Sequence, residues 1–144
     1  MDLTAWQICR EHQVSLTGEQ AHDGERWNAP GRRVVYLAEH PALAVLEMRV
    51  HLDKPYDEVV HDHVLVRVAL PEDVEDLPDI PVDPCAAGEA WLRAARRAVL
   101  RVPSIVVREG RNLLLNPAHP RAKEARIEAC TPFRFDRRLW GGGG

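Results

Sequence analysis

The stretch that decides the fold is GERWNAPGRRVVYLAEHPALAVLEMRVHL, from Gly24 to Leu52. Its first part is polar and contains glycine and proline, which is typical of a turn or loop. Residues 33–38 are short and β-branched and predict a strand. Pro41 follows, and proline suits the first turn of a helix. Because no breaker interrupts the Ala- and Leu-rich residues after it, we predict a helix from Ala42 to about His51.

The rest of the chain carries further strand patterns and one more helical pattern. We expect strands over 64–70, 104–107, 112–115 and 125–135 (the last interrupted at Pro132), an acidic, proline-rich loop over 71–84, and a helix over 89–100 that ends before Pro103. Strands outnumber helices, and the helices sit at irregular spacing between them. The pattern therefore predicts an α+β fold with a mixed β-sheet core and flanking helices.

Composition sets the broad class of the protein. A length of 144 residues, with 45% hydrophobic and 28% charged residues, fits one domain over 1–140, followed by a flexible Gly tail over 141–144. The net charge of −3 argues against direct nucleic-acid binding. Neither a membrane span nor a signal peptide is recognisable, and the three cysteines are widely spaced. We therefore expect a cytoplasmic protein with reduced thiols.

Glu47 is the side chain that fits its surroundings least. On a helix, Leu43 and Val50 flank Glu47 on one apolar face. A buried carboxylate without a partner is costly, so Glu47 is expected to have a partner or a function. The alternatives are that the helix is exposed at this position, or that Glu47 pairs with Arg49 or another arginine.

Two other places combine polar groups with a favourable position. Arg26 and Trp27 lie in the loop, where a guanidinium can bind phosphate oxygens and an aromatic ring can stack on a base. Tyr36 adds a hydroxyl on the strand that follows. Ser104 lies at the start of an expected strand without a GxSxG motif, so hydrogen bonding to a ligand is favoured over covalent attack. A purely structural serine is the alternative.

The histidines offer a weaker, metal-based hypothesis. His61 and His63 share one face of an expected strand beside an acidic stretch, and His51 precedes them. There is neither an HExxH motif nor a third ligand at a diagnostic spacing. A solvated strand entry is therefore favoured, and a metal hydrolase that uses the three histidines stays open. Rossmann and P-loop proteins are excluded because their glycine-rich phosphate loops are missing from the sequence.

Two sequence blocks together resemble the RES-domain toxins. In Gly24–Leu52, a G-x-R-W-N loop leads to a V-V-Y-x-A strand and an A-x-x-E helix. The second block, VPSIVVREGRNLLLNPAHP (Val102–Pro120), is similar to the family's V-P-S strand followed by N-x-L-x-N-P-x-H-P. Both blocks occur in the family's order and at compatible spacing.

The resemblance implies an ADP-ribosyltransferase-like fold and a toxin that degrades NAD⁺ by hydrolysis, or by phosphorolysis with inorganic phosphate. NAD⁺ is then a substrate, and no bound cofactor is expected. The implied partner is a Xre-type helix-turn-helix antitoxin, and a homodimer is expected within the complex. The residues carried over as catalytic are Arg26, Tyr36, Glu47 and Ser104. The residues expected to bind NAD⁺ are Arg26, Trp27, Asn28, Tyr36, Ser104 and Asn116. Asn112 is a further candidate to support the loop of the second block.

The chain departs from the family pattern near its N-terminus. RES proteins commonly carry a W-R pair there, and this chain has Trp6 and Gln7. The missing arginine removes a candidate ligand-binding group, so we expect an altered substrate affinity or reaction outcome. Arg10 and Arg32 are the candidates to replace it.

Cleavage of the nicotinamide–ribose bond passes through a cationic, oxocarbenium-like sugar. Nicotinamide departs neutral without a general acid, so the protein must supply a fixed negative charge and rigid placement. We expect Glu47 to supply the charge, Arg26 to bind the pyrophosphate, and Tyr36 and Ser104 to orient the substrate. ADP-ribosyl transfer to a macromolecule and a non-catalytic antitoxin-binding module are the alternatives.

Overall fold

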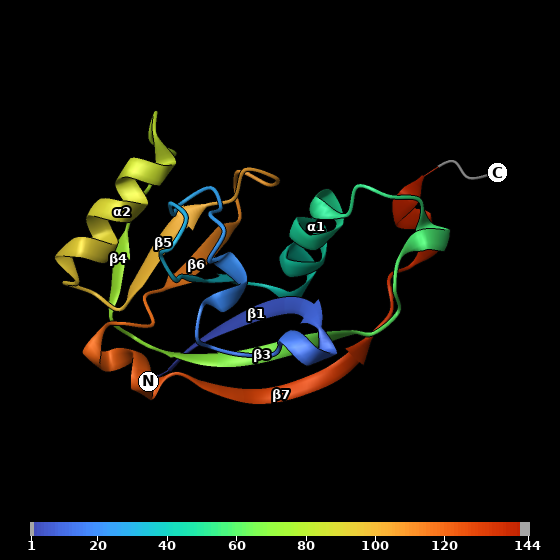
Figure 1. Cartoon of the computed structure of the whole chain (residues 1–144), viewed down its shortest axis with the longest axis horizontal. Coiled ribbons are helices and arrows are strands. Elements are labelled where there is room, and N and C mark those ends of the chain that lie inside the picture. The colour runs from blue at the N-terminus through green and yellow to red at the C-terminus, as the bar shows by residue number, and fades with distance from the viewer. Residues whose placement is uncertain (1, 142–144) are drawn as a thin grey trace.

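The computed structural model describes residues 2–141, whose strands form a mixed seven-stranded sheet (Figure 1). The strand order is β4-β5-β6-β2-β1-β3-β7, and all neighbours are antiparallel except the parallel pair β4 and β5. The strands are β1 (Asp2–Arg10), β2 (Val35–Ala38), β3 (His63–Pro71), β4 (Val74–Asp76), β5 (Val99–Pro103), β6 (Arg111–Leu115) and β7 (Arg126–Phe133). The α-helices are α1 (Pro41–His51) and α2 (Pro84–Ala94). Short 3-10 helices are η1 (Glu11–Gln13), η2 (Glu19–Ala21), η3 (Tyr56–Glu58), η4 (Pro120–Glu124) and η5 (Arg137–Trp140).

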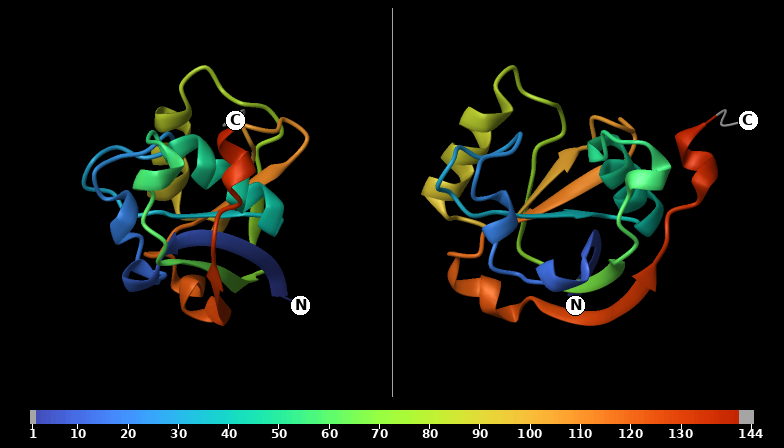
Figure 2. Two further views of the ribbon diagram at one scale, coloured as in Figure 1. Left: turned by 90° about the vertical axis from the view of Figure 1, so that its right-hand side faces the viewer. Right: turned by 45° about the vertical axis from the view of Figure 1, so that its right-hand side comes forward.

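The seven-stranded sheet divides into two halves between β1 and β2. These two strands are paired only through Trp6 and Ala38, whereas β1 pairs with β3 along its whole length. One half of the sheet therefore consists of β4, β5, β6 and β2, and the other of β1, β3 and β7. Figures 1 and 2 show α2 against the first half and α1 above the place where the halves meet.

Helix α1 begins and ends close to the predicted positions. His40 Nδ1 accepts a hydrogen bond from the Ala42 backbone N–H, which satisfies a free donor of the first turn. Leu43 is buried, but Val50 is 62% exposed. The helix is thus confirmed, while the prediction that an apolar face surrounds Glu47 on both sides is wrong at Val50.

The second predicted helix is displaced along the chain. Helix α2 begins at Pro84, where Asp83 caps it by accepting from the Ala86 N–H, and it ends before Ala95, whose φ of 50° reverses the chain. Of the residues predicted to form its last part, 95–98 connect α2 to the sheet, and Val99 and Leu100 begin β5, where Val99 pairs with Leu115 of β6. The apolar run 98–100 is fully buried in this arrangement.

The other strand predictions hold with three differences. The predicted ranges 33–38 and 125–135 contain β2 and β7, and 64–70 and 112–115 lie within β3 and β6. Residues 104–107 form a turn closed by the Ser104 N–H to the Gly110 carbonyl, and the loop 71–84 contains β4. Strand β7 continues through Pro132, because an edge strand can lose one N–H without losing a bond of the sheet. No helix within residues 2–141 is long and apolar enough to cross a bilayer.

His63 lies at the start of β3 in a buried position, where a solvated strand entry was predicted. Its Nδ1 is 3.0 Å from the Val60 carbonyl oxygen, and its ring packs edge-on against Phe135. Burial lowers the pKa of His63 below its ordinary value of 6.5. The folded protein therefore holds this imidazole neutral.

We expect the free energy of unfolding to decrease as the pH falls below about 6.5, because only the unfolded chain then takes up a proton at His63. The variant His63→Phe keeps a ring against Phe135 and removes this titration, so its stability should depend less on pH. Urea unfolding at about pH 7.5 and about pH 5.5 measures the difference. The same pH dependence in both proteins would contradict the role of His63.

Candidate active site

A pocket of about 570 Å³ lies where the two halves of the sheet meet. The lining includes Trp6 and Gln7 of β1, Leu37 of β2 and Glu47 of α1. Other lining residues come from the same three elements, from the segment that precedes β2, from the end of β5 and the turn after it, and from β6. A volume of this size suits a small-molecule ligand. The pocket therefore collects residues from both sequence blocks and from the N-terminal strand.

Glu47 is partly buried and reaches this pocket from the second turn of α1. Its Oε1 accepts hydrogen bonds from Ser104 Oγ at 2.6 Å and from Asn112 Nδ2 at 3.0 Å. The predicted alternative of an ion pair with Arg49 is wrong, because that guanidinium stacks 4.0 Å from the Trp140 ring centroid and donates to backbone carbonyls. Within residues 2–141, Glu47 has neutral donors only, and its Oε2 has no protein partner.

Ser104 lies behind Glu47 and is completely buried. Its Oγ donates to Glu47 and accepts from the backbone N–H groups of Val106 and Val107 at 3.1 and 3.0 Å. It does not line the pocket. The prediction of a hydrogen bond from Ser104 to a ligand is therefore not matched by its position, which instead fixes the Glu47 carboxylate. Asn112, the other donor, does line the pocket.

Tyr36 and Asn28 hold the loop that carries Arg26. The Tyr36 hydroxyl donates to Asn28 Oδ1 at 2.5 Å and accepts from the Trp27 N–H at 3.1 Å. Asn28 Nδ2 in turn donates to the carbonyls of Ala21 and Arg32. Burial raises the pKa of Tyr36, so the hydroxyl keeps its proton and remains a donor. Tyr36 lines the pocket, whereas Asn28 is buried and does not.

Trp27 is not placed to stack on a base. Its side chain is only 3% exposed and packs in a core cluster with Val34 and Trp91. Helix α2 approaches so closely that a Cβ on Gly88 would lie 1.8 Å from the Trp27 carbonyl oxygen. Besides Tyr36, Trp6 on β1 is an aromatic residue that lines the pocket and is partly exposed.

Arg26 is exposed, lines the pocket and has no ion-pair partner within residues 2–141. The two arginines predicted to replace the family arginine do not line the pocket. Arg10 forms a bidentate pair with Asp62, and Arg32 lies 3.4 Å from Glu89. Gln7 does line the pocket, with its Nε2 donating to the Tyr36 carbonyl at 3.4 Å.

Asn116, predicted to bind NAD⁺, has a structural position instead. It is 3% exposed, its Oδ1 accepts from the Ala118 N–H, and it is absent from the pocket lining. Its amide Nδ2 lies 3.5 Å from the Leu92 carbonyl. The side chain therefore secures the turn after β6 against the end of α2.

The three histidines of the metal hypothesis occupy different surroundings. His51 lines the pocket, His61 packs against Tyr56, and His63 is buried. No group of three His, Cys, Asp or Glu side chains within residues 2–141 is placed to hold a metal ion. His51 follows Glu47 by one helical turn, and this i,i+4 spacing could have marked it as a pocket residue.

We expect Tyr36→Phe to lower the free energy of unfolding by about 1 to 3 kcal/mol, because the Trp27 N–H loses its acceptor. The loosened loop should raise KM for the pocket's substrate more than it lowers kcat. Thermal unfolding and steady-state kinetics measure the two effects. A fall in kcat alone, with unchanged stability, would instead place the hydroxyl in contact with the reacting atoms.

The comparisons with known proteins agree with the two sequence blocks. The RES domain family matches residues 4–137. A Prs ADP-ribosylating toxin of Sphingobium sp. (strain YBL2) is 32% identical, and the match covers 96% of this chain and 98% of that protein. A Toxin Res of Pseudomonas putida is 33% identical, with 94% and 98% covered. The chain belongs to the RES domain family.

The fold comparison points in the same direction. The M. tuberculosis MbcT-MbcA toxin-antitoxin complex contains a chain that matches with a TM-score of 0.73 and 19% identity, over 92% of this chain and 85% of that one. This likeness confirms the predicted α+β fold with a mixed sheet. The resemblance to RES-domain toxins, expected from the motifs, is confirmed by the family match.

Proposed function

We propose that this chain is the toxin of a toxin–antitoxin pair and that it cleaves the nicotinamide–ribose bond of NAD⁺. The observation that carries the proposal is the Glu47 carboxylate, which reaches the pocket with neutral hydrogen-bond donors and, among the described residues 2–141, no neutralising cation. We also propose that residues 1–140 act as one catalytic domain in the cytoplasm, where NAD⁺ is available.

The charge of Glu47 suits the chemistry of this bond. Positive charge moves from the pyridinium onto the ribose as nicotinamide leaves, so a fixed negative charge stabilises the transition state more than the ground state. Ser104 and Asn112 both bond to Oε1, which leaves Oε2 for a ribose hydroxyl or the developing cation. Neither donor is charged, so neither of them neutralises the carboxylate.

The opposite end of the substrate needs a cation and a flat surface. Arg26 is the unpaired arginine of the pocket, and its guanidinium can form two parallel bonds to the pyrophosphate. Trp6 supplies an aromatic side chain for a base. Tyr36 and Asn28 act through the loop, since their mutual hydrogen bond fixes the backbone on either side of Arg26. Rigid placement of this kind lowers the barrier without new chemistry.

Three versions of this function differ in the acceptor of the ADP-ribosyl group. Water gives hydrolysis, inorganic phosphate gives phosphorolysis, and a macromolecule gives ADP-ribosylation. The last version is a second candidate, because one relative at 32% identity is named an ADP-ribosylating toxin. All three use the same departure of nicotinamide, so the same pocket residues serve them.

The experiment is incubation of the purified chain with NAD⁺ labelled in its adenylate half. Three samples contain buffer alone, added phosphate, or a cell extract, and the products are resolved by mass. Free ADP-ribose, a phosphorylated ADP-ribose, or label on protein or nucleic acid identifies the acceptor. Intact NAD⁺ in all three samples would contradict the proposal and favour a non-catalytic antitoxin-binding module.

The proposed partner is an antitoxin that covers the pocket and so protects the host from NAD⁺ loss. The structural match comes from a toxin bound to its antitoxin, which supports this assignment. A Xre-type helix-turn-helix antitoxin and a toxin homodimer remain part of the proposal. Inhibition of NAD⁺ loss by the co-purified partner, with the mass of the complex, tests both parts.

A further inference from the structure

The loop of residues 15–34, which precedes β2, contains three arginines, and two of them are already paired. Arg32 lies 3.4 Å from Glu89, and Arg33 lies 3.6 Å from Glu19. Neither of these two arginines lines the pocket. Within residues 2–141, Arg26 is thus the arginine of this loop that is left for a ligand phosphate, and at β1 Gln7 stands in place of the family arginine.

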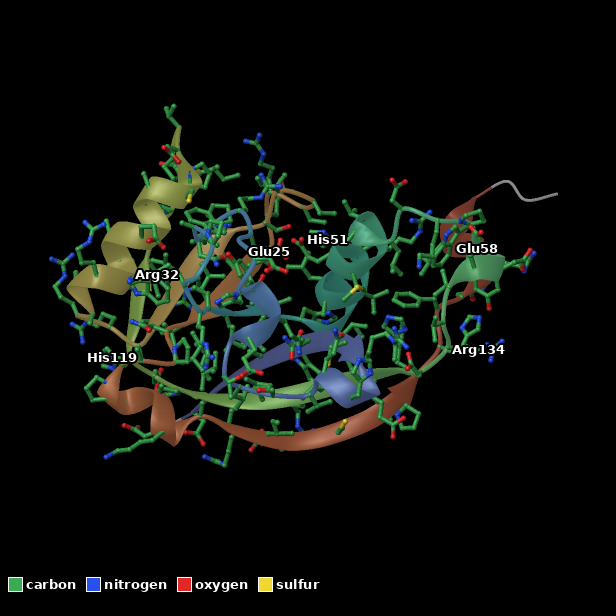
Figure 3. All side chains as sticks on the ribbon, viewed as in Figure 1. Glu25, Arg32, His51, Glu58, His119 and Arg134 are labelled. Atoms are coloured by element: carbon green, nitrogen blue, oxygen red, sulfur yellow. The ribbon has the colours of Figure 1, made fainter. Side chains whose placement is uncertain are left out.

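Glu25, beside Arg26, adds an unpaired negative charge to the same wall. Its side chain is exposed and lines the pocket, and the carboxylate has no ion-pair partner within residues 2–141. The backbone is fixed, because the Glu25 N–H donates to Asn28 and the Asn28 N–H donates back. Figure 3 shows Glu25 on the loop side of the pocket and His51 on the α1 side.

We infer that Glu25 makes this pocket select NAD⁺ over NADP⁺. The inference rests on the proposed function and adds the identity of the dinucleotide. A carboxylate can accept a hydrogen bond from a free ribose hydroxyl, and a phosphate at that hydroxyl removes the donor. Glu25 is therefore a specificity-determining residue for the adenosine half of the substrate.

The charged side chains of the pocket disfavour binding of the 2′-phosphate of NADP⁺. The 2′-phosphate of NADP⁺ is a monoester, and such groups carry about −1.5 to −2 charges at neutral pH. Arg26 is occupied by the pyrophosphate in the proposed complex, and Glu25 and Glu47 both repel a further anion. A site that accepts this phosphate needs an additional arginine or lysine, because burial without one leaves an uncompensated charge. The described lining contains no lysine and no second arginine.

The test compares kcat/KM for NAD⁺ and NADP⁺ in the purified chain and three variants. The unsubstituted chain should prefer NAD⁺ by at least about tenfold. Glu25→Gln should reduce this preference severalfold, and Glu25→Arg should reduce it further or reverse it. Glu58→Gln is the matched control, since Glu58 is exposed, lies outside the pocket lining and sits far from it in Figure 3. It should keep the preference unchanged.

A binding measurement distinguishes selection between the two dinucleotides from the catalytic step. In a Glu47→Gln background, calorimetric titration with each dinucleotide should show the same preference, and adding Glu25→Gln should weaken it. Equal use of NAD⁺ and NADP⁺ by the unsubstituted chain, or an unchanged ratio in both Glu25 variants, overturns the inference while leaving the proposed function intact. Failure to consume either dinucleotide contradicts the proposed function itself.

Discussion

Replacing Glu47 by glutamine is expected to lower kcat for NAD⁺ cleavage by about 10²- to 10³-fold, the usual effect of removing one preorganised electrostatic group. Glutamine keeps an oxygen that accepts from Ser104 and Asn112 and replaces the free Oε2 by an amide nitrogen. The change therefore removes the negative charge and the acceptor at Oε2, while the two hydrogen bonds to Oε1 are kept. Because the substrate's ground state depends less on that charge than the transition state does, KM should change little.

Steady-state kinetics of Glu47→Gln beside Glu58→Gln measure this effect, and circular dichroism with thermal unfolding shows whether the fold is kept. Glu58 is exposed and outside the pocket, so its variant should retain full activity. Turnover by Glu47→Gln within a few-fold of the unsubstituted chain would remove the carboxylate from the mechanism.

Gly88→Ala is expected to destabilise the protein even though alanine is the better helix former by about 1 kcal/mol. A Cβ at this position would lie 1.8 Å from the Trp27 carbonyl oxygen and 3.1 Å from Trp27 Cβ. The obstacle is backbone of the loop that carries Arg26, so α2 and the loop must move apart. We expect a net loss of about 1 to 3 kcal/mol in the free energy of unfolding, together with a higher KM for NAD⁺.

Ala90→Gly is the matched control on the same helix, because Ala90 is exposed and only the helix propensity changes. It should destabilise by about 0.5–1 kcal/mol and leave KM unaltered. Urea unfolding of both variants measures the change in stability, and NAD⁺ kinetics measure the change in KM. A Gly88→Ala protein that is as stable as the parent would contradict the close approach of α2 to the Trp27 loop.

Local signals were sufficient to predict α1 and β2, which line the pocket, and also β3. A proline-led, alanine-rich stretch predicts α1, and β-branched residues predict β2 and β3. They failed at β5, because the apolar run 98–100 suits both a helix face and a strand, and only the pairing with β6 decides. Strand β1 was missed because polar and apolar residues mix along it, although β3 pairs with its full length.

The candidate site was also predictable only in part from local sequence signals. Glu47 could be singled out from its helical neighbours, although the exposure of Val50 shows that the apolar face is narrower than predicted. Its partners could not be assigned from the pattern, since Ser104 and Asn112 lie 57 and 65 positions away in the chain. Contacts of such separation depend on the fold of the whole sheet. The resemblance supplied Ser104 as a site residue, and the geometry gives it a position behind Glu47.

The most direct test of the central claim is the release of nicotinamide from NAD⁺ labelled in the nicotinamide ring, measured over time with the purified, folded chain. The mechanism predicts free nicotinamide in an amount equal to the NAD⁺ lost, whichever acceptor takes the ADP-ribosyl group. NAD⁺ that stays intact throughout the incubation, or that is lost without release of nicotinamide, would contradict the claim that this pocket cleaves the nicotinamide–ribose bond.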